Sequence, residues 1–258
     1  MSVIPIREII ATLHAADLLA NAPVTVGTPL HDAVDGACVD SRLAGPGCLF
    51  VALTGERTDG HRFVDDAVQS GAVAALVAAD ELAAVRRSLF GSATLIPVAD
   101  TLRALHAIAR SWRVRFPELM RIGVTGSNGK TTTKEMLASM LARAGDTVFS
   151  RGNYNSDIGL PLEILRIRAA HRFGVFELGM NRPGEIRELA ELVEPDIAVI
   201  TNVGTAHVGM VGSRRAIAEE KKDIASQFTG AQTAVVPASG EFARFLASDI
   251  SGRVVRYG

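Results

Sequence analysis

Apolar residues along the chain fall into short runs and helical stripes that alternate with each other. Residues 72–78, AVAALVA, and residues 122–125 are apolar runs with the length of a buried strand. The segment 101–115 instead has apolar residues at the spacing of one helix face: Leu102, Leu105, Ile108, Ala109 and Trp112. Strands that alternate with helices predict an α/β protein with a parallel or mixed sheet.

The pattern divides near residues 115–120, where Pro117 is expected to stop a helix. A first, smaller α/β domain is predicted over residues 1–117, with helices at 6–19, 60–70, 80–89 and 101–115 and strands within 39–53, at 72–78 and at 93–98. A second domain is predicted over residues 118–258, with strands at 122–125, 147–150, 173–178, 197–201, 233–236 and 254–255 and helices at 130–144, 160–165, 184–193, 214–228 and 241–246. The regular alternation of the second domain predicts a doubly wound, mostly parallel sheet of the P-loop type, which binds ligands beyond the carboxyl ends of its strands.

Composition narrows the class of protein. The chain has 258 residues, of which 48% are hydrophobic, and a formal net charge of -1. This balance argues against a general nucleic-acid or membrane-surface binder and favours a small-molecule ligand. Cys38 and Cys48 lack a second pair, so neither a disulfide framework nor a zinc site is indicated. The sequence also lacks a secretory leader and an apolar run long enough to span a membrane, so we expect a cytoplasmic protein without a membrane anchor. We also expect a monomer.

The segment 121–134, RIGVTGSNGKTTTK, has the chemistry of a phosphate-binding loop between a strand and a helix. Gly126 and Gly129 allow the backbone amides to turn inward, Lys130 supplies a full positive charge, and the Thr131 hydroxyl suits Mg²⁺. The strict P-loop pattern has glycine at the position of Val124, so this loop is a variant. A plain turn between a strand and a helix is the alternative.

Lysine is scarce in this sequence. Of 27 basic residues only four are lysine, namely Lys130, Lys134, Lys221 and Lys222. Where arginine is the usual cation, a lysine can mark a need for a compact, titratable amine, although codon bias can give the same count. The Lys221–Lys222 pair lies in AIAEEKKDIA, a pattern that by itself indicates a solvated helix face.

Other polar groups follow predicted strands. Glu177 ends the strand at 173–178 and is placed to hold the Mg²⁺ of a nucleotide, or else simply enters solvent. His207 lies in the glycine-rich segment TNVGTAHVGMVGS, where a ligand or metal role competes with a structural one. The amide-rich segment 151–161 suits a substrate clamp, and the polar loop 54–63 is either an anion site or a solvated connection. Together these groups predict an ATP-dependent enzyme that transfers a phosphoryl group.

Four segments make the prediction more specific: GVTGSNGKTTTKEML, GNYNSDIGLPLEIL, ELGMNRPGEI and NVGTAHVGMVGS. In that order they resemble the central domain of the Mur ligases of peptidoglycan synthesis. The segment beginning DSRLAGPGCLFVAL is similar to the domain with which such ligases hold a UDP-sugar. The Asn-rich segment resembles members that add D-alanyl-D-alanine to UDP-N-acetylmuramoyl-tripeptide. There are two alternatives. One is a member that adds a diamino acid to the dipeptide precursor, and the other is a noncatalytic nucleotide- or UDP-sugar-binding module.

The resemblance implies a role for each matching residue. ATP would be bound by Thr125, Gly126, Ser127, Asn128, Gly129, Lys130, Thr131 and Thr132, and Mg²⁺ by Thr131, Glu177, His207 and Lys221. The implied catalytic residues are Lys130, Lys221 and His207, and the implied substrate-binding residues are Ser41, Arg42, Thr54, Asn153, Asn155 and Asp157. Lys221 would be carbamylated, a choice over Lys222 that rests on its spacing to Ile224.

The implied reaction transfers the γ-phosphoryl group of ATP to the terminal carboxylate of the peptide, and the amine of D-alanyl-D-alanine then attacks the acyl phosphate. The segment PASGEF departs from the Asn-x-Asp-like turn that is usual in the family, which leaves the role of that turn open. The resemblance also implies that the ATP domain is incomplete at the C-terminus. We therefore expect this segment alone to be inactive.

Overall fold

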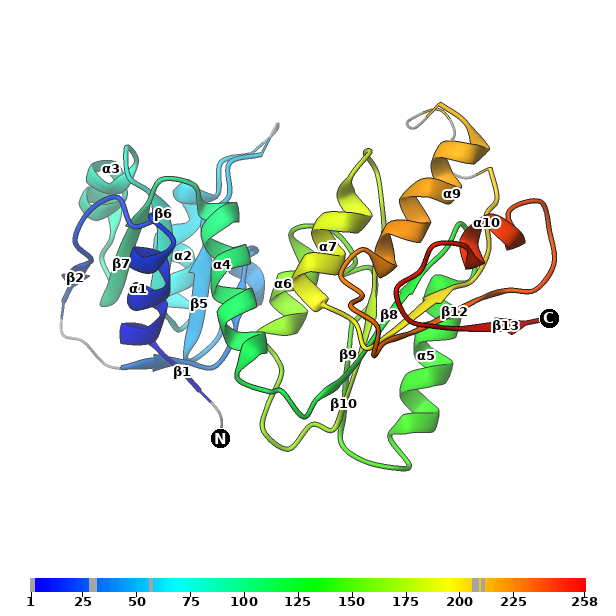
Figure 1. Cartoon of the computed structure of the whole chain (residues 1–258). Coiled ribbons are helices and arrows are strands. Elements are labelled where there is room, and N and C mark those ends of the chain that lie inside the picture. Colours follow the sequence, from blue (N-terminus) through cyan, green and yellow to red (C-terminus); the bar gives the residue numbers. More distant parts are fainter. Residues whose placement is uncertain (1–2, 28–31, 56–57, 206–208, 210–211) are drawn as a thin grey trace. The chain divides into compact units, whose positions relative to one another are not determined.

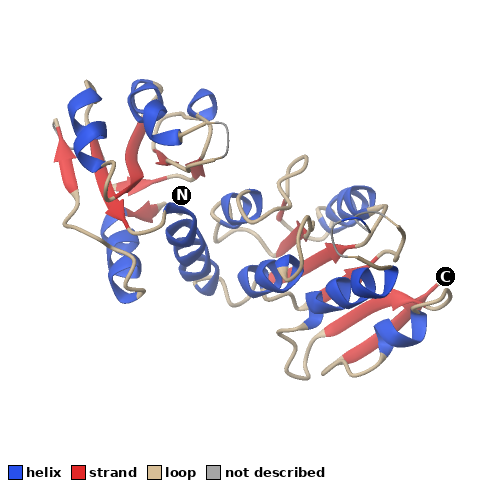
Figure 2. Ribbon diagram, turned by 90° about the horizontal axis from the view of Figure 1, so that it is seen from above, coloured by secondary structure: helices blue, strands red, loops and turns tan. Residues whose placement is uncertain are grey.

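The protein divides into two compact units, Met1–Arg115 and Phe116–Gly258, in a computed structural model (Figure 1). The structure describes residues 3–27, 32–55, 58–205, 209 and 212–258. Each unit is built on a sheet of its own with helices packed against it (Figure 2). Among the described residues, none of the helices has both the length and the apolar character needed to cross a membrane.

The first unit has a five-stranded sheet in the order β2-β7-β6-β5-β4. Its strands are β2 (Val24–Val26), β4 (Ala37–Cys38), β5 (Cys48–Val51), β6 (Ala72–Ala78) and β7 (Ala93–Val98). Only β2 runs antiparallel to its neighbour, so the sheet is mixed. A separate ladder joins β1 (Ile4–Pro5) to β3 (Ala33–Val34). The helices are α1 (Ile6–Ala15), α2 (Val64–Gln69), α3 (Leu82–Ser88) and α4 (Thr101–Val114), with 3-10 turns η1 (Ser41–Leu43) and η2 (Gly60–Phe63).

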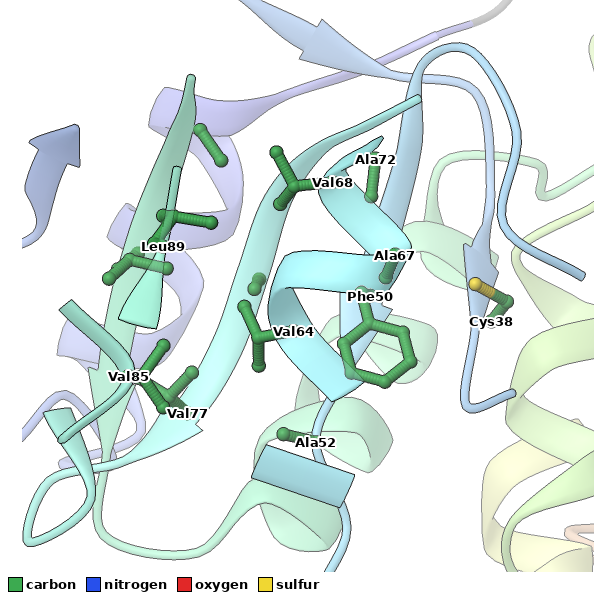
Figure 3. Packing of buried hydrophobic residues seen from close by; sticks show 13 residues of the cluster. Cys38, Phe50, Ala52, Val64, Ala67, Val68, Ala72, Val77, Val85 and Leu89 are labelled. Atoms are coloured by element: carbon green, nitrogen blue, oxygen red, sulfur yellow. The ribbon is translucent and has the colours of Figure 1, made fainter. Parts of the chain in front are cut away.

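The core of the first unit forms where α2 and α3 pack on this sheet. Figure 3 shows Val64, Ala67 and Val68 of α2 beside the fully buried Phe50 of β5, with Val85 of α3 near the end of β6. The side chains from α2 and α3 are small or branched, and they pack around the large Phe50 ring. All come from elements whose apolar residues repeat at helix or strand spacing. The unit therefore closes a hydrophobic core from its own residues.

The second unit has a six-stranded, fully parallel sheet in the order β13-β12-β11-β8-β10-β9. Its strands are β8 (Met120–Thr125), β9 (Thr147–Phe149), β10 (Phe173–Glu177), β11 (Ile197–Ile200), β12 (Thr233–Pro237) and β13 (Arg253–Tyr257). Its helices are α5 (Lys130–Leu141), α6 (Gly159–Ile164), α7 (Glu185–Val193), α9 (Arg214–Lys222) and α10 (Ala243–Ala247), and η3 (Asp223–Ala225) continues α9.

Alternate residues of β8 face opposite sides of this sheet. Ile122 and Val124 pack with Ala138 of α5 in one cluster, whereas a Cβ added at Gly123 would lie 3.2 Å from Cδ1 of Ile224. Because strand side chains alternate, helices must cover both faces, which confirms the doubly wound sheet. The order also places the carboxyl ends of β10, β8 and β11 side by side, where such sheets bind ligands.

Several helices are shorter than predicted, and two of them end early for a clear structural reason. The first ends at Ala15 because Asp17 adopts a left-handed conformation, with φ at 55°. The other, α9, ends at Lys222 and tightens into η3, which brings the fully buried Ile224 onto the sheet. The short strands β1 to β4 were not predicted as separate strands, because runs of two or three residues show no period that distinguishes a strand.

Candidate functional site

The loop between β8 and α5 depends on two glycines. Gly126 has φ at 152°, and a Cβ there would lie 1.8 Å from the hydroxyl oxygen of Thr201. Gly129 has φ at 78° and is the N-cap of α5, with open space where a Cβ would lie. The first glycine is therefore required by close packing and the second by backbone conformation. Gly123 lies inside β8, where the Ile224 side chain packs against it, so it does not replace the loop glycine of the strict pattern.

The tip of this loop is fixed by residues that follow β11. The Thr201 hydroxyl donates to the carbonyl of Asn128 at 2.6 Å, and Asn202 Nδ2 donates to the same oxygen at 2.9 Å. The Asn128 amide donates to Asn202 Oδ1 at 3.0 Å, and the Gly204 amide donates to Ser127 Oγ at 2.8 Å. Thr201 and Asn202 were not among the predicted site residues. The signal that could have identified them is a pair of polar residues directly after the strand beside β8.

A carboxylate lies against the first turn of α5. The Thr131 hydroxyl donates to Glu177 Oε2 at 2.8 Å, and Asn155 Nδ2 donates to Glu177 Oε1, also at 2.8 Å. Glu177 ends β10 and is only 2% exposed. Lys130 Nζ donates to the carbonyl of Gly126 at 3.0 Å, so its charge lies over the loop. The Thr125 hydroxyl donates to the Leu178 carbonyl at 2.9 Å and joins the ends of β8 and β10.

Lys221 of α9 reaches the same edge of the sheet. Its side chain is 1% exposed, and its Nζ lies 4.0 Å from the sulfur of Met180. Burial, assisted by the nearby charge of Lys130 and opposed by Glu220, lowers the pKa of Lys221 to about 8. Lys222 points elsewhere, with Nζ 4.6 Å from the Phe245 ring centroid and 3.3 Å from Ser248 Oγ.

The donor set at this edge suits a hard cation beside a phosphate. Thr131 and Glu177 present oxygen atoms, and the amides of the first turn of α5 and its dipole favour an anion. No group of three or more His, Cys, Asp and Glu side chains could hold a metal within the described ranges. His207, the remaining predicted ligand, lies outside the described residues.

The segment after β9 is held tightly against this site. The Gly179 amide donates to the Asn155 carbonyl at 2.8 Å, and a Cβ at Gly159 would lie 2.6 Å from Cα of Tyr154. Asn153 is exposed and Asp157 is half-buried, so both lie at the surface beside Asn155. Asn155 itself is engaged with Glu177 and orients the carboxylate.

The predicted substrate residues of the first unit form a separate group. Asp40 caps η1, and its hydrogen bonds from Arg42 hold the pKa of the carboxyl below its ordinary value. Ser41 is half-buried, and the Arg42 side chain is 86% exposed. Thr54 forms an isolated bridge with Asp59 at the base of the polar loop.

His61 anchors the other end of that loop and is only 4% exposed. Its Nε2 accepts from the Ala78 amide at 2.8 Å, so the proton lies on Nδ1, which is 2.7 Å from Asp59 Oδ1. Both ring nitrogens are used within the protein. The loop is thus held at both ends, by the bridge at Thr54 and by His61.

Comparison with known proteins decides the family. Residues 124–258 match the Mur ligase middle domain, and residues 34–113 match the Mur ligase family, catalytic domain. The chain belongs to the Mur ligase family. A UDP-N-acetylmuramoyl-tripeptide--D-alanyl-D-alanine ligase of Treponema pallidum is 48% identical over 229 residues, which cover 86% of this chain and 49% of the relative.

Solved Mur ligases have the same fold. MurF from Acinetobacter baumannii superimposes with a TM-score of 0.83 at 33% identity, over 100% of this chain and 54% of that one. MurF ligase from Thermotoga maritima, solved in complex with ADP, gives a TM-score of 0.72 at 32% identity, over 86% of this chain and 50% of that one. The chain thus spans about half the length of the curated Mur ligases it matches.

Proposed function

We propose that this chain forms the ATP- and UDP-sugar-binding part of an ATP-dependent ligase that adds D-alanyl-D-alanine to UDP-N-acetylmuramoyl-tripeptide. The observation that carries the proposal is the contact of Thr131 with Glu177 at 2.8 Å, directly beside the clamped glycine loop. A hydroxyl and a carboxylate beside a phosphate-binding loop are the protein's usual contribution to binding a nucleotide with its Mg²⁺. The names of the relatives support the choice of substrates.

ATP would be bound by the loop and the first turn of α5. The amides and side chains involved are those of Thr125, Gly126, Ser127, Asn128, Gly129, Lys130, Thr131 and Thr132. Lys130 would move from the Gly126 carbonyl to the phosphates, where its charge is better compensated. The relative solved in complex with ADP supports nucleotide binding by this chain.

Mg²⁺ would be held by Thr131 and Glu177, with His207 and a carbamylated Lys221 completing the set. The cation would neutralise charge on the transferred phosphoryl group. Asn155 would keep Glu177 oriented by its hydrogen bond to Oε1.

Carbamylation would convert Lys221 from a cation to an anion. The neutral amine attacks CO₂, a C–N bond forms, and the nitrogen loses one proton, which leaves a carboxylate on the side chain. Burial supports Lys221 as the modified residue because a buried amine is more easily neutral, whereas the Lys222 ammonium faces an aromatic ring.

The substrate would be held by Ser41, Arg42 and Thr54 at the UDP-sugar end and by Asn153, Asn155 and Asp157 near the reacting carboxylate. The peptide carboxylate would take the γ-phosphoryl group of ATP and release ADP. The amine of D-alanyl-D-alanine would then attack the acyl carbon and release phosphate, so that a new amide bond forms. We place this reaction in the cytoplasm, in a monomeric enzyme that makes peptidoglycan precursors and binds neither nucleic acid nor a membrane.

The test is phosphate release from ATP by the protein that carries this chain, supplied with each precursor and each amine. We expect release that depends on UDP-N-acetylmuramoyl-tripeptide and D-alanyl-D-alanine together. Release only with the dipeptide precursor and a diamino acid would contradict the proposal. Lys130→Ala and Lys221→Ala should each abolish phosphate release, whereas Lys222→Ala should retain it. Small carboxylic acids should partly restore Lys221→Ala by replacing the lost anion.

A further inference from the structure

Lys134 is a fully buried lysine that the proposed function leaves without a role. It lies one turn after Lys130 in α5 and is 0% exposed. Its Nζ donates to the Ser150 carbonyl at 2.6 Å and lies 2.9 Å from Glu135 Oε1. The Phe149 ring centroid is 5.9 Å away. The ammonium is thus compensated on several sides although it is buried.

Ser150 links this lysine to the candidate Mg²⁺ site. The residue is fully buried directly after β9, and its amide donates to the Val175 carbonyl of β10 at 3.0 Å. Its hydroxyl accepts from the amide of Glu177 at 3.2 Å. Lys134 therefore fixes the residue that holds the backbone of Glu177, while Thr131 and Asn155 hold the carboxylate.

We propose that Lys134 is a positioning residue that sets Glu177 for Mg²⁺ through Ser150, an inference that rests on the proposed function. The same contact fixes the start of the segment that carries Asn155, because Ser150 immediately precedes Arg151. The backbone of Glu177 is thus aligned from one buried ammonium, while Thr131 and Asn155 hold its carboxylate. Partners of this kind commonly change metal affinity when they are removed.

The choice of lysine supports a specific role. Of 27 basic residues in the chain, only four are lysine, so arginine is the usual cation. A buried charge is costly unless it is well paired, and a planar guanidinium cannot replace a compact ammonium in a closed site. Core packing alone would be served equally well by an uncharged side chain of similar volume, such as methionine.

The first experiment measures amide hydrogen exchange of the full chain by NMR, without Mg²⁺ or nucleotide. In Lys134→Met we expect exchange at the Glu177 amide to be faster by about 10-fold, because its hydrogen-bond acceptor is no longer fixed. Ser150→Ala should have the same effect, and the double variant should be no faster, because both changes break one chain of contacts. Thr147→Val is the matched control, since it removes a side-chain hydrogen bond at the other end of β9.

The second experiment measures ADP binding by calorimetry as a function of Mg²⁺ concentration. In Lys134→Met and Ser150→Ala, the Mg²⁺ concentration at which the change in ADP affinity is half-maximal should rise by roughly 10- to 100-fold. The ADP affinity in excess chelator should be unchanged. Ser150→Ala retains the bond from Lys134 to the carbonyl and tests only the contact of Ser150 with the Glu177 amide, so if Lys134→Met does not fold, Lys134→Gln takes its place in both experiments.

The outcomes separate the two proposals. An unchanged Glu177 amide, or an unchanged Mg²⁺ dependence in variants that exchange faster, would overturn the positioning role of Lys134. Absence of any Mg²⁺ dependence in the unaltered chain would instead contradict the proposed function. A weakened ADP affinity that is equal with and without Mg²⁺ would also overturn the inference, because it would place Lys134 at the phosphates.

Discussion

The buried ammonium of Lys221 costs the folded chain stability. Its pKa is lowered to about 8 from an ordinary value of 10.5, mainly by burial. Below about pH 8 both folded and unfolded chains hold the proton, so the full cost of burying the ammonium is present. Between about pH 8 and 10.5 only the unfolded chain holds it, so stability from this group rises with pH.

We therefore expect Lys221→Met to stabilise the chain at pH 7 by on the order of 2–3 kcal/mol in CO₂-free buffer. The gain should shrink as the pH is raised from 8 toward 10. Urea unfolding at several pH values measures it. Lys222→Met is the control and should show no gain, since its ammonium is compensated by an aromatic ring. A destabilised Lys221→Met variant at pH 7 would contradict the argument.

The carbamylation proposed for Lys221 can be tested without any assay of activity. In ¹³C-labelled bicarbonate we expect a carbamate signal in the NMR spectrum that grows as the pH is raised toward 8, because the neutral amine is the reactive form. Lys221→Gln should lose this signal and Lys222→Gln should keep it. The reverse result would assign the modification to Lys222.

The two loop glycines should respond differently to the same substitution. Gly126→Ala places a Cβ 1.8 Å from the Thr201 hydroxyl, so it should displace Thr201 and abolish nucleotide binding. Gly129→Ala meets no atom and should cost only about 1 kcal/mol for its left-handed backbone. Thermal unfolding and ADP calorimetry on both variants test this, and equal losses would contradict it.

The residues of the candidate site could be predicted where the sequence signal is local. Lys130 and Thr131 were placed by a motif whose residues are consecutive, and Glu177 by its position at the tip of a strand. The contacts of Thr201 and Lys134 could not be predicted, because their partners, Asn128 and Ser150, are distant in sequence. Only the fold brings such pairs together.

At the scale of elements, β8 has different tasks at its two ends. The carboxyl end leads to the loop, whereas at the amino end Arg121 is bound by Asp196 through its backbone amide at 2.8 Å and its guanidinium at 3.0 and 3.1 Å. The contact joins β8 to the residue that precedes β11.

We expect Asp196→Ala to destabilise the second unit by about 1–2 kcal/mol while Mg²⁺-dependent ADP binding stays unchanged. Asp223→Ala removes a comparable but more exposed pair with Arg187 and should cost less than about 0.5 kcal/mol. Urea unfolding and calorimetry measure the two effects. A loss of nucleotide affinity in Asp196→Ala that exceeds the loss of stability would show that the two ends of β8 are coupled.

The elements whose apolar residues repeat most regularly were predicted most accurately. The helix α4 has apolar residues on one face over four turns and was predicted to within one residue of its end. In α9 the alternating charges continue past Lys222 into Asp223, so pattern alone could not show where the helix tightens. The structural reason is tertiary, since Ile224 must reach the sheet opposite Gly123.

At the scale of the whole molecule, each unit closes its own core. In the second unit, β8, α5 and β10 contribute Ile122, Val124, Ala138 and Val175 to one cluster. The described residues of the candidate nucleotide site all belong to the same unit. The cluster of Phe50, Val64 and Leu95 belongs to the first unit. Units with separate cores are expected to fold independently.

Residues 116–258 expressed alone should therefore unfold cooperatively and bind ADP with the same Mg²⁺ dependence as the whole chain. Residues 1–115 alone should also fold, and should bind UDP without responding to Mg²⁺. Circular dichroism with heating and calorimetry with each nucleotide measure these properties. If residues 116–258 fold but lose Mg²⁺-dependent binding, the first unit must contribute to the nucleotide site. If they do not fold, the hydrophobic cluster around β8 is insufficient and stability is shared between the units.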